Sequence, residues 1–216
     1  MDKIKSLIKS EKPLRWVFTG DSITHGLRHT YGYRDYVQIF EERITGELTR
    51  NKDAIIKTGV SGWTTGALRS SLNLHVLDFS PDIVSLMIGM NDCARIPITE
   101  FEDNYKYILD AILNSGKTSI LLHTPNPIIP NCDVTRTLLP EFVEKILEIA
   151  SSYNLPIINH YEYWNKSWDE NSRRIYSWMS DAIHPNHFGH RAFARLIMQE
   201  LDIWSEETNS IGVRIP

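Results

Sequence analysis

Short apolar runs alternate with amphipathic stretches along the whole chain. Five runs are apolar at nearly every position and have the length of buried strands, namely residues 14–19, 54–58, 82–89, 118–123 and 156–159. Between these runs, apolar residues recur every three or four positions, which places them on one face of a helix. This spacing is found in Val37, Phe40, Ile44 and Leu48, and in the stretches 101–112, 142–150 and 193–201.

The alternation predicts a parallel sheet covered by helices on both faces. Strands that are apolar at every position must be buried on both sides, and strands that alternate with helices are typically parallel. We therefore predict a three-layer α/β/α fold. No repeat, low-complexity segment or Gly/Ser linker divides the chain, so we expect one domain over residues 1–216. Residues 161–180, rich in Trp, Tyr and Asn, are expected to form a loop or short helix before the last helix.

Composition narrows the function mainly by exclusion. The chain has 216 residues, of which 42% are hydrophobic, enough for a full core. It carries 23 Lys and Arg against 27 Asp and Glu, without a dense basic cluster, so we expect no nucleic-acid partner. No apolar run is long enough to span a bilayer, and residues 1–12 lack the apolar core of a signal peptide. We therefore expect a soluble, cytoplasmic protein. Cys93 and Cys132 are too few for a disulfide framework and show no metal-site spacing, which agrees with a reducing compartment.

The candidate chemistry lies where strands end. In an open parallel sheet, ligands bind beyond the carboxyl ends of the strands. Three of these ends combine a glycine with short polar side chains: residues 20–24 (GDSIT), 59–64 (GVSGWT) and 89–92 (GMND). A fourth segment, residues 181–185 (DAIHP), precedes the last helix. Pro185 favours an extended backbone at His184, and Asp181 is close enough in sequence to reach the imidazole ring.

These segments together supply the groups of a serine hydrolase. A serine that attacks an ester needs a base, the base needs a carboxylate, and the oxyanion that forms needs hydrogen-bond donors. Each segment alone is also an ordinary turn or helix cap. Their combination and their positions at strand ends favour a catalytic Ser22, His184 and Asp181.

In this order, the four segments resemble the sequence blocks of the GDSL, or SGNH, hydrolases, from Gly20 to His184. The resemblance implies a flavodoxin-like sheet of five strands and no metal or other cofactor. It also implies Ser22 as nucleophile, with His184 and Asp181 completing the triad. The oxyanion hole would consist of the backbone N–H groups of Ser22 and Gly62 and the side-chain amide of Asn91. The first block reads GDSIT rather than GDSL, and Trp63 follows Gly62; both differences bear on substrate choice.

The substrate is less defined than the reaction. The resemblance to intracellular members with GDSIT blocks favours an acetyl ester of a carbohydrate, so the expected partner is a small-molecule ester. A short-chain thioesterase or a lysophospholipase is the alternative in the same class, and a non-catalytic binding protein is the alternative in another. Asp21, Trp63 and Trp178 are the expected substrate contacts. Asp21 also suits a structural role through hydrogen bonds to the loop backbone.

Other candidate sites are weaker. His184, His187 and His190 are spaced by three, but such side chains spread around a helix, and no carboxylate or cysteine completes a tetrahedral metal site. Cys93 is more typical of a small buried residue than of a nucleophile. The tail 205–216 ends in an apolar stretch that suits docking on a second copy or on the same chain, which leaves a homo-oligomer open.

Overall fold

The computed structural model describes residues 1–170 and 176–207. Its centre is a sheet of five parallel strands in the order β2-β1-β3-β4-β5. This is the flavodoxin-like order, and it confirms the predicted sheet. The strands are β1 (Arg15–Gly20), β2 (Ala54–Lys57), β3 (Ile83–Met87), β4 (Ser119–His123) and β5 (Ile157–Ile158).

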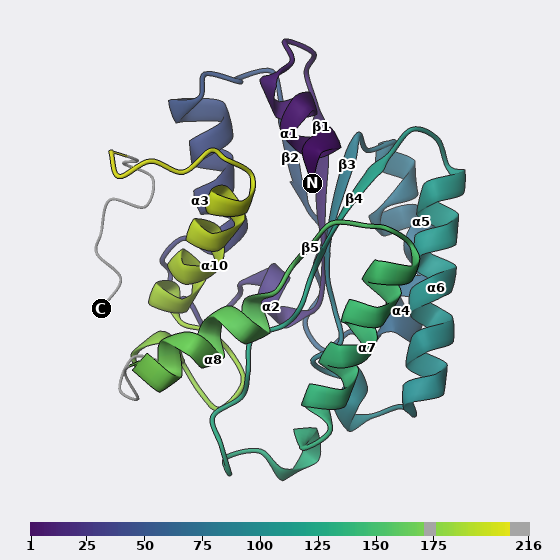
Figure 1. Ribbon diagram of the computed structural model, residues 1–216, viewed down its shortest axis with the longest axis vertical. Coiled ribbons are helices and arrows are strands. Elements are labelled where there is room, and N and C mark those ends of the chain that lie inside the picture. Colours follow the sequence, from purple (N-terminus) through teal and green to yellow (C-terminus); the bar gives the residue numbers. More distant parts are fainter. Residues whose placement is uncertain (171–175, 208–216) are drawn as a thin grey trace.

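Helices cover both faces of the sheet, which confirms the three-layer architecture (Figure 1). Helices α3 (Tyr36–Glu41) and α10 (His187–Glu200) lie on one face, and α4 (Thr65–Ser70), α5 (Leu72–His75), α6 (Ile98–Asn114) and α7 (Leu139–Ser152) lie on the other. Because both faces are covered, every residue of β3 and β4 is buried.

Aromatic side chains fill much of the core. On one face, the ring of Phe40 from α3 packs against Trp16 and Phe18 of β1, with centroids 5.0 and 5.1 Å apart. On the other face, Phe101 of α6 packs against Phe142 of α7 at 4.9 Å. The predicted helical faces at these positions therefore point toward the sheet.

Two helices differ from the expectations. Helix α1 (Asp2–Lys9) forms in the charged N-terminal stretch because Ile4 and Ile8, one turn apart, are both buried. Helix α8 (His160–Glu170) occupies half of the segment that was expected to be a loop or short helix, and Trp164 on it is fully buried. The expected docking of the tail 205–216 depends on its apolar end, and residues 208–216 lie outside the described residues.

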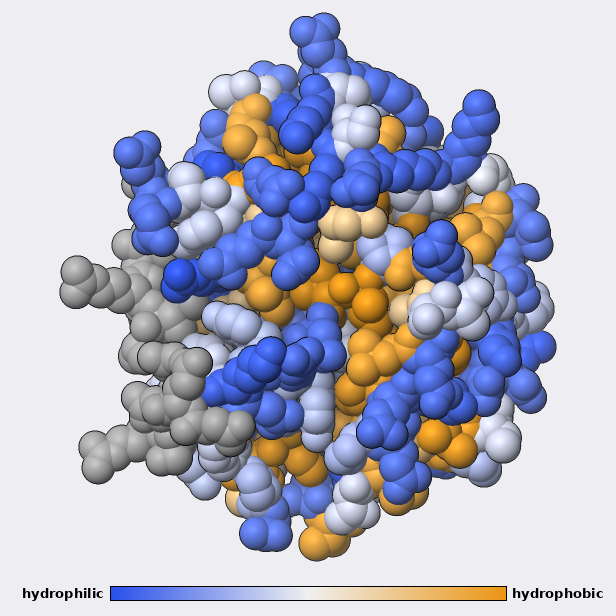
Figure 2. All heavy atoms as spheres, in the orientation of Figure 1, coloured by the Kyte–Doolittle hydropathy of each residue, from blue (hydrophilic) through white to orange (hydrophobic). Residues whose placement is uncertain are grey.

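Helix length and the distribution of apolar side chains bear on contact with a membrane. In the described ranges, no helix is both long enough and apolar enough to cross a bilayer. In the orientation of Figure 1, apolar side chains gather in the middle of the visible face, and hydrophilic side chains surround them (Figure 2).

Candidate active site

Ser22 begins the short helix α2 (Ser22–His25), directly after β1. The chain turns at Gly20, whose φ is 148°, and a Cβ there would lie 1.8 Å from the carbonyl oxygen of Met87. Only glycine fits this close approach between β1 and β3. The Asp21 carboxylate accepts a hydrogen bond from the Ile23 N–H at 3.0 Å and caps the helix. Ser22 is thereby fixed at the carboxyl edge of the sheet, with 8% of its surface exposed.

His184 and Asp181 lie in line with Ser22, although 162 positions separate Ser22 from His184. Ser22 Oγ is 3.0 Å from His184 Nε2, and His184 Nδ1 is 2.9 Å from Asp181 Oδ2. The backbone N–H groups of Ile183 and His184 also donate to Asp181 Oδ1, at 2.8 and 2.7 Å. Partial burial raises the pKa of Asp181, but these hydrogen bonds outweigh it and hold the pKa below its usual value.

The loop that carries this pair is braced at its base. Its two sides are joined by the Ser180 N–H to the His184 carbonyl and by the Asn186 N–H to the Trp178 carbonyl, both at 2.8 Å. Asn186 then caps α10 by accepting hydrogen bonds from Phe188 and Gly189. The loop is therefore held at both of its ends.

Trp178 supports this loop from below. Its side chain is 2% exposed and meets Trp164 edge-to-face at 5.0 Å. A Cβ on Gly189 would lie 2.5 Å from the Trp178 carbonyl oxygen, so α10 packs closely against the loop. The Trp178 ring is thus buried beneath the loop and packs against it, and its expected contact with substrate stays a prediction.

Gly62 lies on the loop after β2, which is bound to the chain on either side of Ser22 through Gly20 and His25. The Val60 N–H donates to the Gly20 carbonyl at 3.0 Å, and the Trp63 N–H closes a turn onto the Val60 carbonyl at 3.2 Å. Gly62 has a φ of +83° in this turn, a conformation that favours glycine. Its carbonyl accepts a hydrogen bond from Arg95 at 2.6 Å.

Asn91 is held from both ends of its amide. Nδ2 donates to the Trp63 carbonyl at 2.9 Å, and Oδ1 accepts from Arg136 Nη2 at 3.2 Å. Because a guanidinium only donates, the atom that faces Arg136 must be the oxygen, and this fixes the direction of the NH₂ group. Among the described residues, no acceptor is found for its second N–H. Arg136 was not among the predicted site residues, because nothing near it in the sequence indicates its contact with Asn91, 45 positions away.

The two other expected substrate contacts behave differently. Asp21 is fully buried, and burial raises its pKa to about 7. Its structural role is observed, because it caps α2, and its contact with substrate stays a prediction. Trp63 contacts the site through its carbonyl, whereas its ring packs edge-on against His75 of α5 at 4.5 Å. Whether the Trp63 ring also meets an acyl group stays a prediction.

His29 is a second histidine at the Asp181 carboxylate. Its ring stacks on the ring of His184, with centroids 3.7 Å apart and planes 6° apart, and its Nδ1 is 3.4 Å from Asp181 Oδ2. Burial, followed by the nearby His184, lowers the pKa of His29, which favours its neutral form. The sequence offers no signal for it, since His29 lies in a loop far from residues 181–184.

His29, Asp181 and His184 are close enough together to suggest a metal site. A metal ion must lie near the plane of each imidazole that binds it, in the direction of the nitrogen lone pair. Two stacked, nearly parallel rings have no such point in common. This geometry therefore suits stacking of the two imidazole rings beside the Asp181 carboxylate better than binding of a metal ion.

The other rejected candidates also have separate roles. His190 is buried and accepts the Tyr36 N–H at 3.2 Å, while His187 stacks on Tyr33 at 4.3 Å. These two rings and His184 thus contact three different partners. Burial raises the pKa of Cys93 to about 12, so its thiol stays protonated at neutral pH.

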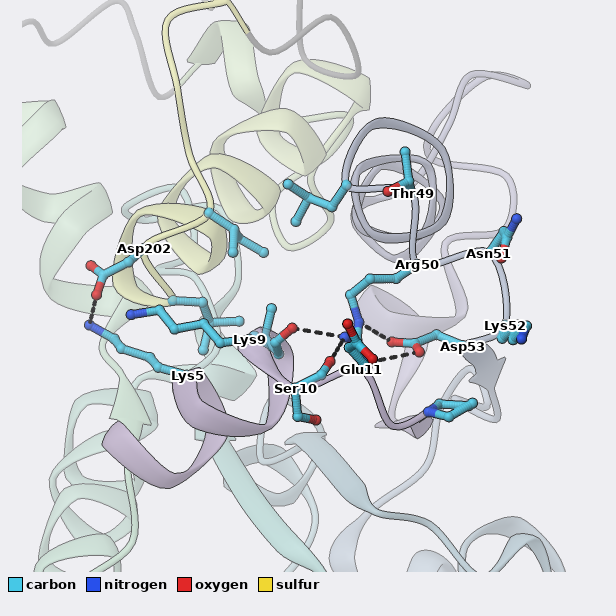
Figure 3. Close-up of a pocket in the computed structure, with 15 residues that line it drawn as sticks. Lys5, Lys9, Ser10, Glu11, Thr49, Arg50, Asn51, Lys52, Asp53 and Asp202 are labelled. Carbon is cyan, nitrogen blue, oxygen red and sulfur yellow. Dashed lines mark hydrogen bonds and ion pairs between the residues drawn. The ribbon is translucent and has the colours of Figure 1, made fainter.

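A hollow of about 520 Å³ lies at the opposite edge of the sheet, between α1, the segment before β2 and the end of α10. Figure 3 shows that its charged groups face one another: Lys5 pairs with Asp202, and Arg50 reaches Asp53 and the carbonyl of Ser10. The Arg50 guanidinium also binds the carbonyls of Ile8 and Lys12. Arg50 therefore ties α1 to the sheet, and this hollow is separate from Ser22.

Comparison with known proteins identifies the family. Residues 18–192 match the model of the GDSL-like lipase/acylhydrolase family. An acetylxylan esterase of Geobacillus stearothermophilus is 27% identical over 208 residues, which cover 86% of this chain and 92% of that protein. A protein of Mycoplasma pneumoniae is 29% identical over 126 residues, but these cover 57% of this chain and only 14% of that protein.

Solved structures show the same fold. An α/β hydrolase from the metagenome of Lake Arreo aligns with a TM-score of 0.77 at 21% identity, covering 90% of this chain and 99% of that one. A catalytic mutant of the Geobacillus acetylxylan esterase Axe2 aligns with a TM-score of 0.76 at 23% identity, covering 89% and 96%.

The fold and the family together define a carboxylic ester hydrolase. The chain belongs to the GDSL-like lipase/acylhydrolase family, which confirms the resemblance found in its sequence blocks.

Proposed function

We propose that this protein is a serine esterase that removes acetyl groups from a carbohydrate. The observation that carries the reaction type is the hydrogen-bonded row from Ser22 Oγ through His184 to Asp181, with distances of 3.0 and 2.9 Å. The likeness to an acetylxylan esterase over most of both chains supports the substrate class. An acetyl ester of a sugar hydroxyl fits both the proposed reaction type and the proposed substrate class.

The reaction would proceed in two half-reactions. Ser22 Oγ gives its proton to His184 Nε2 and attacks the ester carbonyl, and Asp181 stabilises the imidazolium that forms. The N–H groups of Ser22 and Gly62 and the Asn91 amide would receive the oxyanion. The C–O bond to the sugar then breaks as His184 protonates the sugar oxygen, which departs as a hydroxyl and leaves an acetyl group on Ser22. A water molecule, deprotonated by His184, releases acetate and restores Ser22.

Two residues would hold this machinery in position. Arg136 keeps the Asn91 NH₂ group turned toward the oxyanion by binding the amide oxygen. His29 supports the ring of His184 by stacking on it and shares the Asp181 carboxylate. Because the lowered pKa of His29 keeps it neutral near pH 7, it adds no positive charge beside the His184 imidazolium.

Acyl-chain length tests the proposal. Ser22 is only slightly exposed and Gly62 is followed by bulky Trp63, so a short acyl group should fit best. We expect kcat/KM on p-nitrophenyl esters to fall from acetate to butyrate to octanoate, and acetylated xylo-oligosaccharides to release acetate. A preference for octanoate, or lysophospholipid hydrolysis without release of acetate from sugars, would support a lipid-directed enzyme. No ester hydrolysis at all would support a non-catalytic binding protein.

A further inference from the structure

A second hollow lies at the same edge of the sheet as Ser22, and nothing in the reaction described above uses it. Its volume is about 470 Å³, and we call it the aromatic pocket. One wall is α8, with Tyr161, Asn165 and Trp168, and the other is the loop after β4, with Asn131, Asp133 and Arg136.

Hydrogen bonds connect this pocket to both halves of the candidate site. The loop wall is tied to the residues just before His184, because Ile129 N–H donates to the Ala182 carbonyl at 2.9 Å and Asn126 Nδ2 donates to the Ile183 carbonyl at 3.0 Å. Arg136, which lines the pocket, also holds the Asn91 amide. The walls of the pocket are therefore bound both to the loop that carries His184 and to Asn91.

The lining combines aromatic surface with fixed polar groups. Tyr161 and Trp168 are half-buried, and each exposes an apolar ring with a polar tip. Asn131 and Asn165 offer amide donors and acceptors, and Asp133 forms an ion pair with Arg136 at 2.5 Å. Aromatic faces suit the C–H faces of a pyranose ring, while amides and carboxylates suit its hydroxyl rim.

Neither an acyl chain nor the acetyl group itself fits this lining well. A fatty chain would remove water from the Asp133–Arg136 ion pair and from the two asparagines without giving them hydrogen bonds, which costs free energy. An acetyl group is far smaller than the cavity. The volume lies within the range of pockets that hold a ligand larger than one acyl group.

We propose that the aromatic pocket binds a sugar residue of the alcohol part of the ester and so selects carbohydrate substrates. This inference rests on the proposed function, because it requires that the acetyl group be carried by a sugar. Ring stacking on Trp168 and hydrogen bonds to Asn165 orient the sugar while its acetyl group reaches Ser22.

The test compares two acetyl esters that differ only in the alcohol. Acetylated xylo-oligosaccharide can fill the pocket, whereas ethyl acetate is too small to reach it from Ser22. In Trp168→Ala and in Asn165→Ala, we expect the ratio of kcat/KM for the oligosaccharide to that for ethyl acetate to fall about tenfold, mainly through KM. As a matched control, Tyr107→Ala removes an exposed aromatic ring from α6, on the other face of the sheet, and should leave the ratio unchanged.

The outcomes separate this inference from the proposed function. If wild-type protein releases acetate from the oligosaccharide but neither variant changes the ratio, the pocket is not the sugar site and the proposed function stands. Equal losses on both esters would also overturn the inference, since they indicate a structural role for α8. If wild-type protein cleaves ethyl acetate but no acetylated sugar, the proposed substrate class fails, and the pocket assignment fails with it.

Discussion

Two serine–histidine hydrogen bonds of the described residues join a serine Oγ to a histidine Nε2 in nearly the same geometry. At the edge of the sheet, Ser22 Oγ is 3.0 Å from His184 Nε2, and His184 Nδ1 is bound by Asp181. In the core, Ser85 Oγ is 2.7 Å from His123 Nε2, and His123 Nδ1 lies 3.1 Å from His160 Nε2. The first pair reaches the surface, and the second is completely enclosed between β3, β4 and α8.

The surroundings, and not the pair itself, separate the two. His184 has a carboxylate that can stabilise its charged form, whereas His123 faces another imidazole. Burial lowers the pKa of His123 to about 3, so it remains neutral and cannot accept a proton at neutral pH. No strand end or oxyanion donor lies beside Ser85, because it sits in the middle of β3. A serine–histidine hydrogen bond therefore indicates catalysis only together with a carboxylate, donors and access.

Replacing each serine by alanine should separate the pairs most strongly. Ser22→Ala should lower kcat by at least about a thousandfold and leave the free energy of unfolding nearly unchanged, because Ser22 lies at the edge. Ser85→Ala should keep kcat but destabilise the protein by about 1–3 kcal/mol, because His123 loses a buried partner. Ester hydrolysis and urea unfolding measure both effects. Near wild-type hydrolysis by Ser22→Ala would exclude Ser22 as the nucleophile.

Asn91→Ala removes the proposed side-chain donor to the oxyanion. We expect kcat to fall roughly a hundredfold with little change in KM, because the donor acts on charge that develops in the transition state. Asn104 provides a matched control: it is also bound by an arginine, Arg69, at 3.0 Å, but it belongs to α6. Asn104→Ala should leave kcat unchanged. An effect of Asn91→Ala on KM alone would instead assign Asn91 to ground-state binding.

Arg136→Gln should lower kcat about tenfold by releasing the Asn91 amide from its fixed direction. Combined with Asn91→Ala, it should add little further loss, because both changes affect the same donor. Arg69→Gln, which frees the matched Asn104, is the control. Additive losses in the double variant would indicate that Arg136 acts independently of Asn91.

The contacts of the candidate site show which of its features can be predicted from the sequence. The strands and the four blocks were found because apolar runs and glycine-rich strand ends are local patterns. The contacts of Arg136 and His29 in the site span more than 40 positions and leave no local signature. The burial of Trp178 depends on its packing against Trp164 of α8, which the sequence does not show either. An aromatic residue near one of these blocks, such as Trp178, looks the same in sequence whether it faces substrate or supports the loop.

The buried histidines should make the protein sensitive to acid. Burial keeps the pKa of His123 at about 3 and of His190 at about 4, and that of His160 well below its usual value. Their stabilising contribution is complete above pH 6.5 and is lost as the pH falls, because only the unfolded chain binds the protons. Burial raises the pKa of Asp21 to about 7 and of Asp92 to about 6, which opposes this loss.

Three histidines against two carboxyls leave about one proton, so the free energy of unfolding should fall by on the order of 1 kcal/mol per pH unit between pH 6 and 5. Asp21→Asn removes one opposing carboxyl and should roughly double this slope in urea unfolding. A stability that rises on acidification over this range would show that the buried histidines do not dominate.

His29 should have the smallest effect. His29→Ala removes a ring stack worth about 0.5–1.5 kcal/mol, so kcat should fall roughly three- to tenfold with KM little changed. His29→Phe retains a flat ring against His184 and should restore most of kcat. If phenylalanine does not rescue kcat, the polar contact of His29 Nδ1 with the Asp181 carboxylate, rather than the stack, is the important contact.

Covalent labelling compares the two serines directly. A p-nitrophenyl phosphonate should inactivate the protein in step with the addition of one phosphonyl group, and peptide mass spectrometry should locate that group on Ser22, with none on Ser85. His184→Ala should react far more slowly, because the Ser22 hydroxyl then has no base. Labelling at another residue, or a rate unchanged by His184→Ala, would contradict Ser22 as the nucleophile activated by His184.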